Sequence, residues 1–159
     1  MDTNATTIER FYEALSRGDY STMGACYHPE VHFSDPVFED LHGLDASAMW
    51  HMLCESGSDL NVTFDNVTGE GTTGGAHWEA RYTFSPTGRW VHNKIDARFE
   101  FADGLITRHA DTFDLWKWTR MALGTTGLLI GWTPSAKSKV RSTAQDRLAR
   151  FIGDHPEYQ

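Results

Sequence analysis

Four segments in which apolar and polar residues alternate follow one another between residues 61 and 113, and they constrain the fold more than any other feature. The segments read NVTFDNVTGE, AHWEARYTFS, WVHNKIDARFEF and LITRHADTFD. Alternation of this kind is the pattern of a β-strand with one buried face. Turn-type residues separate the segments at Gly74-Gly75, at 86–88 and at 102–104. The sequence therefore predicts four strands in series that form an antiparallel meander.

Helices are predicted ahead of this meander. Residues 6–17 place apolar side chains at helical spacing, with Thr6 or Thr7 as the N-cap. Residues 20–26 and 44–57 are expected to form two more helices, because each carries apolar residues and is bounded by glycine or a turn. A short strand is expected between these two helices.

The chain after residue 115 is expected to form a helix, a Gly-rich loop at 124–134 and a final helix over about 135–152. Helices that precede a long antiparallel sheet are typical of an α+β domain. We therefore predict a curved antiparallel sheet that forms a cone, N-terminal helices over its concave face, and a C-terminal helical extension. The 159 residues suit a single domain, with a core over about 5–115 and the extension over about 116–159.

Composition argues against several kinds of partner. The chain carries 14 Lys and Arg against 22 Asp and Glu, a net charge of -8, so neither nucleic acid nor an anionic membrane surface is an expected partner. Cys26 and Cys54 have no CxxC neighbour and are interpreted as reduced thiols of a cytoplasmic protein. The eight histidines show no HxH or HxxxH pair with a carboxylate in register, so we predict no metal site and no cofactor.

Asp35 is the first candidate for a general base. It lies in the segment HFSDPVFEDLHG, where Val31 and Phe33 alternate along a short strand and Asp35 continues the inward face. A carboxylate on an apolar face loses water, which raises its pKa toward the range of useful proton transfer. The alternative interpretation is that Asp35 only caps a turn, since Asp before Pro36 is a common turn opening.

The last predicted strand carries a second acidic candidate. Leu105, Thr107, His109, Asp111 and Phe113 are expected to share one face. If that face lines a pocket, His109 and Asp111 are neighbours that can relay a proton. The alternative is an ion pair at the surface of the sheet.

Two more alternating stripes are expected along the middle strands. One stripe is Trp78, Ala80, Tyr82 and Phe84, and the next is Asn93, Ile95, Ala97, Phe99 and Phe101. Asn93 is the single amide in these stripes, and it either orients a ligand carbonyl or hydroxyl or satisfies a backbone group. His77, Glu79 and Arg81 alternate with the first stripe and are expected on the opposite face.

Two local patterns resemble a known superfamily. The segments RFYEALSRGD and SDPVFEDLHG resemble those of ketosteroid isomerases, and LITRHADTFD resembles the last strand of limonene epoxide hydrolases. Both groups belong to the nuclear transport factor 2-like superfamily, and the chain resembles its SnoaL-like branch over about residues 5–115. The resemblance implies that Asp35 is a proton-shuttling carboxylate, that Asp111 is a second active-site carboxylate, and that the outer sheet face forms a homodimer.

The sequence and this resemblance predict a cofactor-independent acid–base enzyme of isomerase, hydratase or dehydratase, or cyclase type. Its expected substrate is a small hydrophobic molecule in an apolar pocket, with Asp35 as base and His109 with Asp111 as the acid or orienting pair. The side chains expected to bind the substrate are Phe11, Tyr12, Tyr27, Trp50, Trp78, Tyr82, Asn93, Phe99 and Phe113. The alternative is a non-catalytic module of the same fold that binds a hydrophobic ligand or dimerises.

Overall fold

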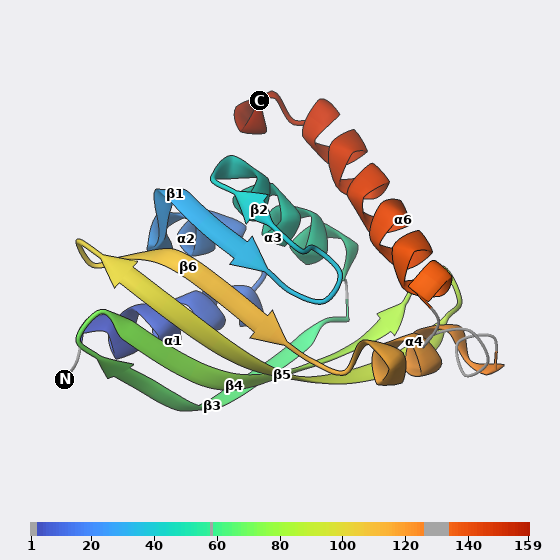
Figure 1. Cartoon of the computed structure of the whole chain (residues 1–159), viewed down its shortest axis with the longest axis horizontal. Coiled ribbons are helices and arrows are strands. Elements are labelled where there is room, and N and C mark those ends of the chain that lie inside the picture. The colour runs from blue at the N-terminus through green and yellow to red at the C-terminus, as the bar shows by residue number, and fades with distance from the viewer. Residues whose placement is uncertain (1–2, 58, 126–133) are drawn as a thin grey trace.

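A computed structural model describes residues 3–57, 59–125 and 134–159 (Figure 1). Within these residues one curved, unclosed sheet has the strand order β2-β1-β6-β5-β4-β3. The strands are β1 (Tyr27–Ser34), β2 (Leu41–His42), β3 (Asn61–Glu70), β4 (Thr73–Phe84), β5 (Arg89–Ala102) and β6 (Leu105–Thr112). The protein is therefore an α+β domain built on the predicted meander, because β3 to β6 pair antiparallel in chain order.

The sheet is mixed, whereas an antiparallel sheet was predicted. Strand β1 pairs parallel with β6, its partner from the far end of the meander, and antiparallel with the short β2. Parallel neighbours need a long connection, and helix α3 with the four strands β2 to β5 between β1 and β6 provides it. The alternation in β1 predicts a strand but carries no information about its direction relative to β6.

The helices are α1 (Thr3–Ser16), α2 (Tyr20–Cys26), α3 (Leu44–Ser56), α4 (Leu115–Leu123) and α6 (Pro134–Gly153), followed by a 3-10 turn at Pro156–Tyr158. Helix α1 begins earlier than predicted, so Thr7 lies inside it and its hydroxyl donates to the carbonyl of Thr3. Tyr12 of α1 packs on Trp78 and Phe99 of the inner sheet face, with ring centroids 5.6 and 6.2 Å away. None of the described helices is both long and apolar enough to cross a membrane.

The turn between β3 and β4 lies at Gly71-Thr72, so the prediction of a turn at Gly74-Gly75 is wrong. Gly71 has a φ of 60°, the left-handed conformation that favours glycine. Gly74 belongs to β4, and a Cβ built there would lie 2.7 Å from Ile8 Cδ1 and 2.8 Å from the Thr68 carbonyl oxygen. The absence of a side chain at Gly74 therefore lets α1 approach the sheet.

Substitution Gly74→Ala is expected to lower the free energy of unfolding by about 2 kcal/mol, because the added methyl group on β4 would clash with Ile8 of α1 and with the Thr68 carbonyl of β3. Urea unfolding checks this. Gly75→Ala is the matched control, since its Cβ would meet Ala97 O at 3.3 Å and Thr68 Oγ1 at 3.4 Å and should cost less. Equal stability of Gly74→Ala and the natural chain would contradict the close packing.

A register shift between β5 and β6 changes which residues of β6 face inward. Glu100 pairs with Arg108 and Phe101 with Ile106, so Thr107 has no partner of its own. Ile106, His109 and Asp111 are consequently the buried residues of β6. The prediction that Leu105 and Thr107 share the face of His109 is wrong, because simple alternation does not reveal a bulge.

Helix α6 folds back from α4 toward α3 (Figure 1). Its Leu148 is buried in the core, and Arg141 Nε donates to the Pro36 carbonyl at 3.0 Å. At the C-terminus the Tyr158 hydroxyl is 2.9 Å from Nδ1 of His51 on α3. The C-terminal extension is thus held against its own domain through helix α6 and at the C-terminus. The predicted Gly-rich loop at 124–134 falls almost wholly outside the described residues.

Candidate functional site

A cavity of about 650 Å³ lies between the inner sheet face and helices α3, α4 and α6. Most of its wall is apolar. Among the residues proposed from the sequence, its wall includes Asp35, Trp50, Trp78, Tyr82, Asn93, Asp111 and Phe113. Both candidate carboxylates therefore line the same apolar cavity, as an acid–base site requires.

Asp35 follows the last residue of β1 and both caps a turn and lines the cavity. Its Oδ1 accepts hydrogen bonds from the backbone N–H groups of Val37 and Phe38, at 2.7 and 2.6 Å. The turn-capping interpretation is thus confirmed, and the same side chain also lies in the cavity wall. Within the described chain no hydrogen bond is made by Oδ2, which leaves this oxygen available to a ligand.

Burial, with a smaller contribution from the charge of Asp111, raises the pKa of Asp35 to about 7, against the lowering effect of the hydrogen bonds from the N–H groups of Phe38 and Val37. At neutral pH the carboxyl group is therefore present in both its protonated and its ionised form. A group with this pKa can both take and return a proton without a large free-energy cost.

Asp111 is held by a chain of buried hydrogen bonds. Trp50 Nε1 donates to the Tyr27 hydroxyl at 2.8 Å, this hydroxyl is 2.8 Å from His109 Nδ1, and His109 Nε2 is 2.9 Å from Asp111 Oδ1. Because indole can only donate, the Tyr27 proton is directed to Nδ1, which places the imidazole proton on Nε2. In this arrangement the Nε2–H group of His109 donates to Asp111 Oδ1 and fixes the orientation of that side chain.

His109 itself is fully buried and is not part of the cavity wall. Its ring lies 4.3 Å from that of Phe99 and 5.0 Å from that of Phe33. Four aromatic residues that were expected to bind the substrate also lie in the core behind the wall: Phe11, Tyr12, Tyr27 and Phe99. In the described chain they support the residues that line the cavity and do not line it themselves.

Three polar side chains in the wall can donate hydrogen bonds to a ligand. The Tyr82 hydroxyl accepts from Trp118 Nε1 of α4 at 2.7 Å, which leaves its own proton to be donated. Burial raises the pKa of Tyr82, so this proton is retained at neutral pH. Asn93 is buried in the wall, and Trp78 Nε1 is buried there without a hydrogen-bond partner among the described residues. A polar ligand atom can satisfy such a group.

Part of the wall was not predicted from the sequence. Helix α6 contributes Lys139, Val140, Ala144 and Arg147, so the C-terminal helix belongs to the cavity of its own chain. The spacing of Val140 and Ala144 indicated an apolar helix face but not what covers it. Lys139 and Arg147 are the cationic residues of the described wall, and their spacing gave no signal of this role.

The outer sheet face carries a hydrogen-bonded polar cluster. Glu79 Oε1 lies 3.1 Å from Arg81 Nη2 and 2.6 Å from His92 Nε2, and Glu79 Oε2 lies 2.9 Å from His77 Nε2. The hydrogen bonds from His77 and His92 lower the pKa of Glu79 to about 2. The carboxylate is therefore fixed within this face rather than turned toward the cavity.

Two groups of potential metal ligands occur among the described residues, although no His spacing in the sequence indicated them. They are His32 with Asp40 and His42, and His51 with Glu55 and His155. The first forms because β1 and β2 pair with His32 opposite His42. Cross-strand register is the signal that would have revealed it.

Comparisons with known proteins place this geometry in context. The family model of the SnoaL-like domain matches residues 8–109. No curated protein matches the sequence.

Three solved structures are similar in fold. An NTF2-like protein of unknown function from Burkholderia pseudomallei is 21% identical, with a TM-score of 0.67 over 77% of this chain and 98% of its own. A candidate SnoaL-like polyketide cyclase from Jannaschia sp. CCS1 is 19% identical, with a TM-score of 0.68 over 77% of this chain and 92% of its own. An LEH-like epoxide hydrolase from M. tuberculosis is 18% identical, with a TM-score of 0.62 over 80% of this chain and 96% of its own.

Proposed function

The chain belongs to the SnoaL-like domain family, and on that premise we propose that it is a cofactor-independent acid–base enzyme acting on a small hydrophobic molecule. The reaction is of isomerase, hydratase or dehydratase, or cyclase type. One observation carries the proposal: Asp35, with a pKa raised to about 7, and Asp111 line the same apolar cavity. The names of two neighbours, a candidate polyketide cyclase and an epoxide hydrolase, agree with this class of chemistry.

In the proposed mechanism Asp35 is the group that exchanges a proton with the substrate. Its Oδ1 is anchored by two backbone N–H groups, so Oδ2 takes the proton from a carbon next to a carbonyl group. In an isomerisation the proton then returns from Asp35 to another atom of the substrate. In a cyclisation the carbanion attacks a second carbonyl group of the same molecule, and Asp35 returns its proton to the alkoxide oxygen that forms. Every proton is thus accounted for by one carboxyl group.

The negative charge that develops on the substrate oxygen needs hydrogen-bond donors. Tyr82 and Asn93 supply them in the proposed complex, because both line the cavity and the Tyr82 proton is not used by Trp118. Burial and, to a smaller extent, the charge of the Asp111 side chain, which His109 orients, raise the pKa of Asp35 and keep it partly protonated at neutral pH. His109 is a positioning residue in this scheme.

A panel of hydrophobic ketones, diketones and epoxides tests the proposal. Compounds that raise the melting temperature are incubated with the protein in D₂O, and NMR follows deuterium entry next to the carbonyl group or formation of product. The proposal expects exchange or conversion of at least one bound compound. Binding without any chemical change across the panel would overturn it and would favour the ligand-binding module.

We also propose that two copies pair through the outer sheet face. Trp90 is 57% exposed and alternates with inward-facing Val91, which places it on the same face as the Glu79 cluster. An exposed indole beside an ordered polar cluster is a favourable interface. Light scattering is expected to give the mass of a dimer for the natural chain and of a monomer for Trp90→Lys. A monomeric natural chain would contradict this. We also propose a cytoplasmic location, which the free thiols of Cys26 and Cys54 support.

A further inference from the structure

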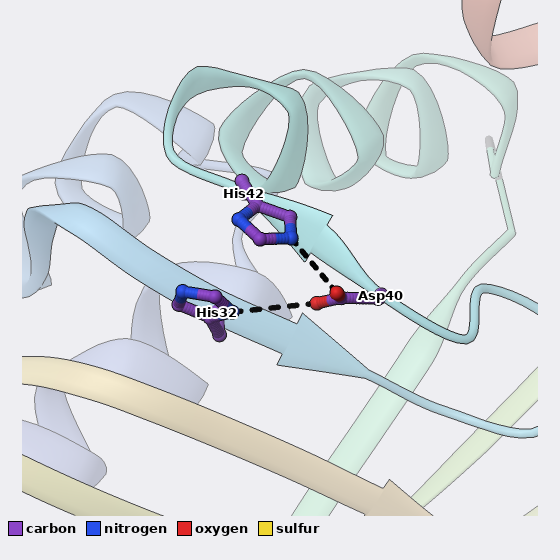
Figure 2. Close-up of side chains that lie close together, drawn as sticks. All are labelled: His32, Asp40 and His42. Atoms are coloured by element: carbon purple, nitrogen blue, oxygen red, sulfur yellow. Dashed lines mark hydrogen bonds and ion pairs between the residues drawn. The ribbon is translucent and has the colours of Figure 1, made fainter.

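We propose that His32, Asp40 and His42 form a site for one Zn²⁺ ion that clamps the β1–β2 hairpin. Figure 2 shows the two imidazole rings on neighbouring strands with the Asp40 carboxylate between them. Asp40 Oδ2 is 2.8 Å from His42 Nε2, and Asp40 Oδ1 is 3.4 Å from His32 Nδ1. The proposal does not depend on the proposed function, because none of the three residues lines the cavity.

The backbone holds the two histidines in place. His32 pairs with His42 in the β1–β2 ladder, and their ring centroids are 4.0 Å apart. Just after His42, Gly43 has a φ of 55° and its N–H donates to the Val31 carbonyl at 2.8 Å. These contacts fix the chain at the end of β2. The backbone positions of two of the three ligands are therefore fixed before an ion binds, which lowers the entropic cost of binding.

The separations are compatible with zinc. One ligand atom from each residue lies within 4.8 Å of the other two. Tetrahedral zinc, with bonds of about 2.0–2.2 Å, places neighbouring ligand atoms about 3.3 Å apart. The side chains of His32, His42 and Asp40 are 50%, 59% and 59% exposed, so small rotations can close this difference without disturbing the core.

The donor set selects the kind of metal. Two imidazole nitrogens and one carboxylate oxygen suit borderline transition metals such as Zn²⁺, whereas Ca²⁺ and Mg²⁺ prefer oxygen ligands alone. An exposed aspartate carboxyl group is ionised at neutral pH, as a zinc ligand must be. Water is left to fill the fourth position, as at other sites with three protein ligands.

The second group of potential ligands is less suited to an ion. His51 is stacked on Tyr20 with centroids 3.5 Å apart, and its two ring nitrogens already contact the Tyr158 hydroxyl and Glu55. An ion there would have to displace the contact that holds the C-terminus. The hairpin site requires only that Asp40 release its hydrogen bonds to two exposed rings.

Calorimetric titration of the tag-free, metal-free protein with ZnCl₂ at neutral pH tests the site. We expect one bound ion in the natural chain and an affinity at least about tenfold lower in His32→Gln and in His42→Gln. His155→Gln, from the second group, is the matched control and should bind like the natural chain. Zn²⁺ should also raise the melting temperature of the natural chain and of His155→Gln more than that of His42→Gln.

Each other result overturns the proposal. Failure of the natural chain to bind Zn²⁺ excludes the site, and equal affinity in His42→Gln places the ion elsewhere. Loss of binding in His155→Gln alone assigns the ion to the C-terminal group. Circular dichroism and melting of the metal-free variants establish that each is folded, which is expected for His32→Gln and His42→Gln because these two side chains are exposed.

Discussion

Substitution Asp35→Asn is expected to reduce turnover roughly a thousandfold, because the amide cannot exchange a proton with the substrate. The amide oxygen can still accept the hydrogen bonds from Val37 and Phe38, so the turn after β1 should remain. Steady-state rates on the compound that the ketone and epoxide panel identifies measure the effect. Asp103→Asn, at an exposed turn, is the control and should keep the natural rate. An unchanged rate in Asp35→Asn would remove Asp35 from the mechanism.

The free energy of unfolding of Asp35→Asn is expected to rise relative to that of the natural chain as pH increases. The pKa of Asp35 rises from 3.8 to about 7 on folding. Between these values the unfolded chain loses the proton and the folded chain keeps it, so the natural protein loses stability relative to Asp35→Asn as pH increases. The difference should be near zero at about pH 4 and on the order of 4 kcal/mol at about pH 8. Urea unfolding across this range measures it, and a constant difference would contradict the raised pKa.

Replacing His109 by Leu is expected to lower the free energy of unfolding by about 3–5 kcal/mol. The buried Asp111 carboxylate loses the donor at 2.9 Å, and the Tyr27 hydroxyl loses the acceptor at 2.8 Å. Denaturant unfolding at neutral pH measures the loss.

Two further variants separate the hydrogen bonds of His109 from its packing. His109→Gln keeps an N–H that can reach Asp111, so its loss should be smaller. The double variant with Leu at both His109 and Asp111 should recover much of the stability, because no buried charge is then left without a partner. If the single and double Leu variants are equally unstable, packing rather than the Asp111 charge explains the effect.

The elements that depend on local pattern could be predicted from the sequence. Helix α2 (Tyr20–Cys26) has the predicted bounds, and the meander of β3 to β6 is confirmed. The SnoaL-like family assignment is also confirmed. Each of these features is encoded by alternation, helical spacing and turn residues that lie close together in the chain.

Features that depend on tertiary contacts could not be predicted in this way. Gly74 was predicted to lie in a turn. A glycine is required at this position because Ile8, 66 positions earlier in the sequence, packs closely against it. The bulge at Thr107 and the parallel pairing of β1 with β6 also leave no local signal. Each arises from an element that is distant in the sequence.

The candidate site shows the same division. Asp35 and Asp111 were found because each continues an alternating strand, and both line the cavity. The position of His109 behind Asp111 depends on the Tyr27 and Trp50 hydrogen bonds, which come from a different strand and a helix. The wall residues of α6 depend on how the C-terminal helix folds back, which its own spacing does not determine.

The most direct test of the account is a ¹³C NMR titration of the aspartate side-chain carboxyl groups. In the natural chain one carboxyl group is expected to titrate with a midpoint near pH 7, and this titration should be absent in Asp35→Asn. In Asp111→Asn this midpoint should fall, because the charge that raises the pKa of Asp35 has been removed. A titration in which every aspartate carboxyl group ionises in the ordinary range near pH 4 would contradict the account.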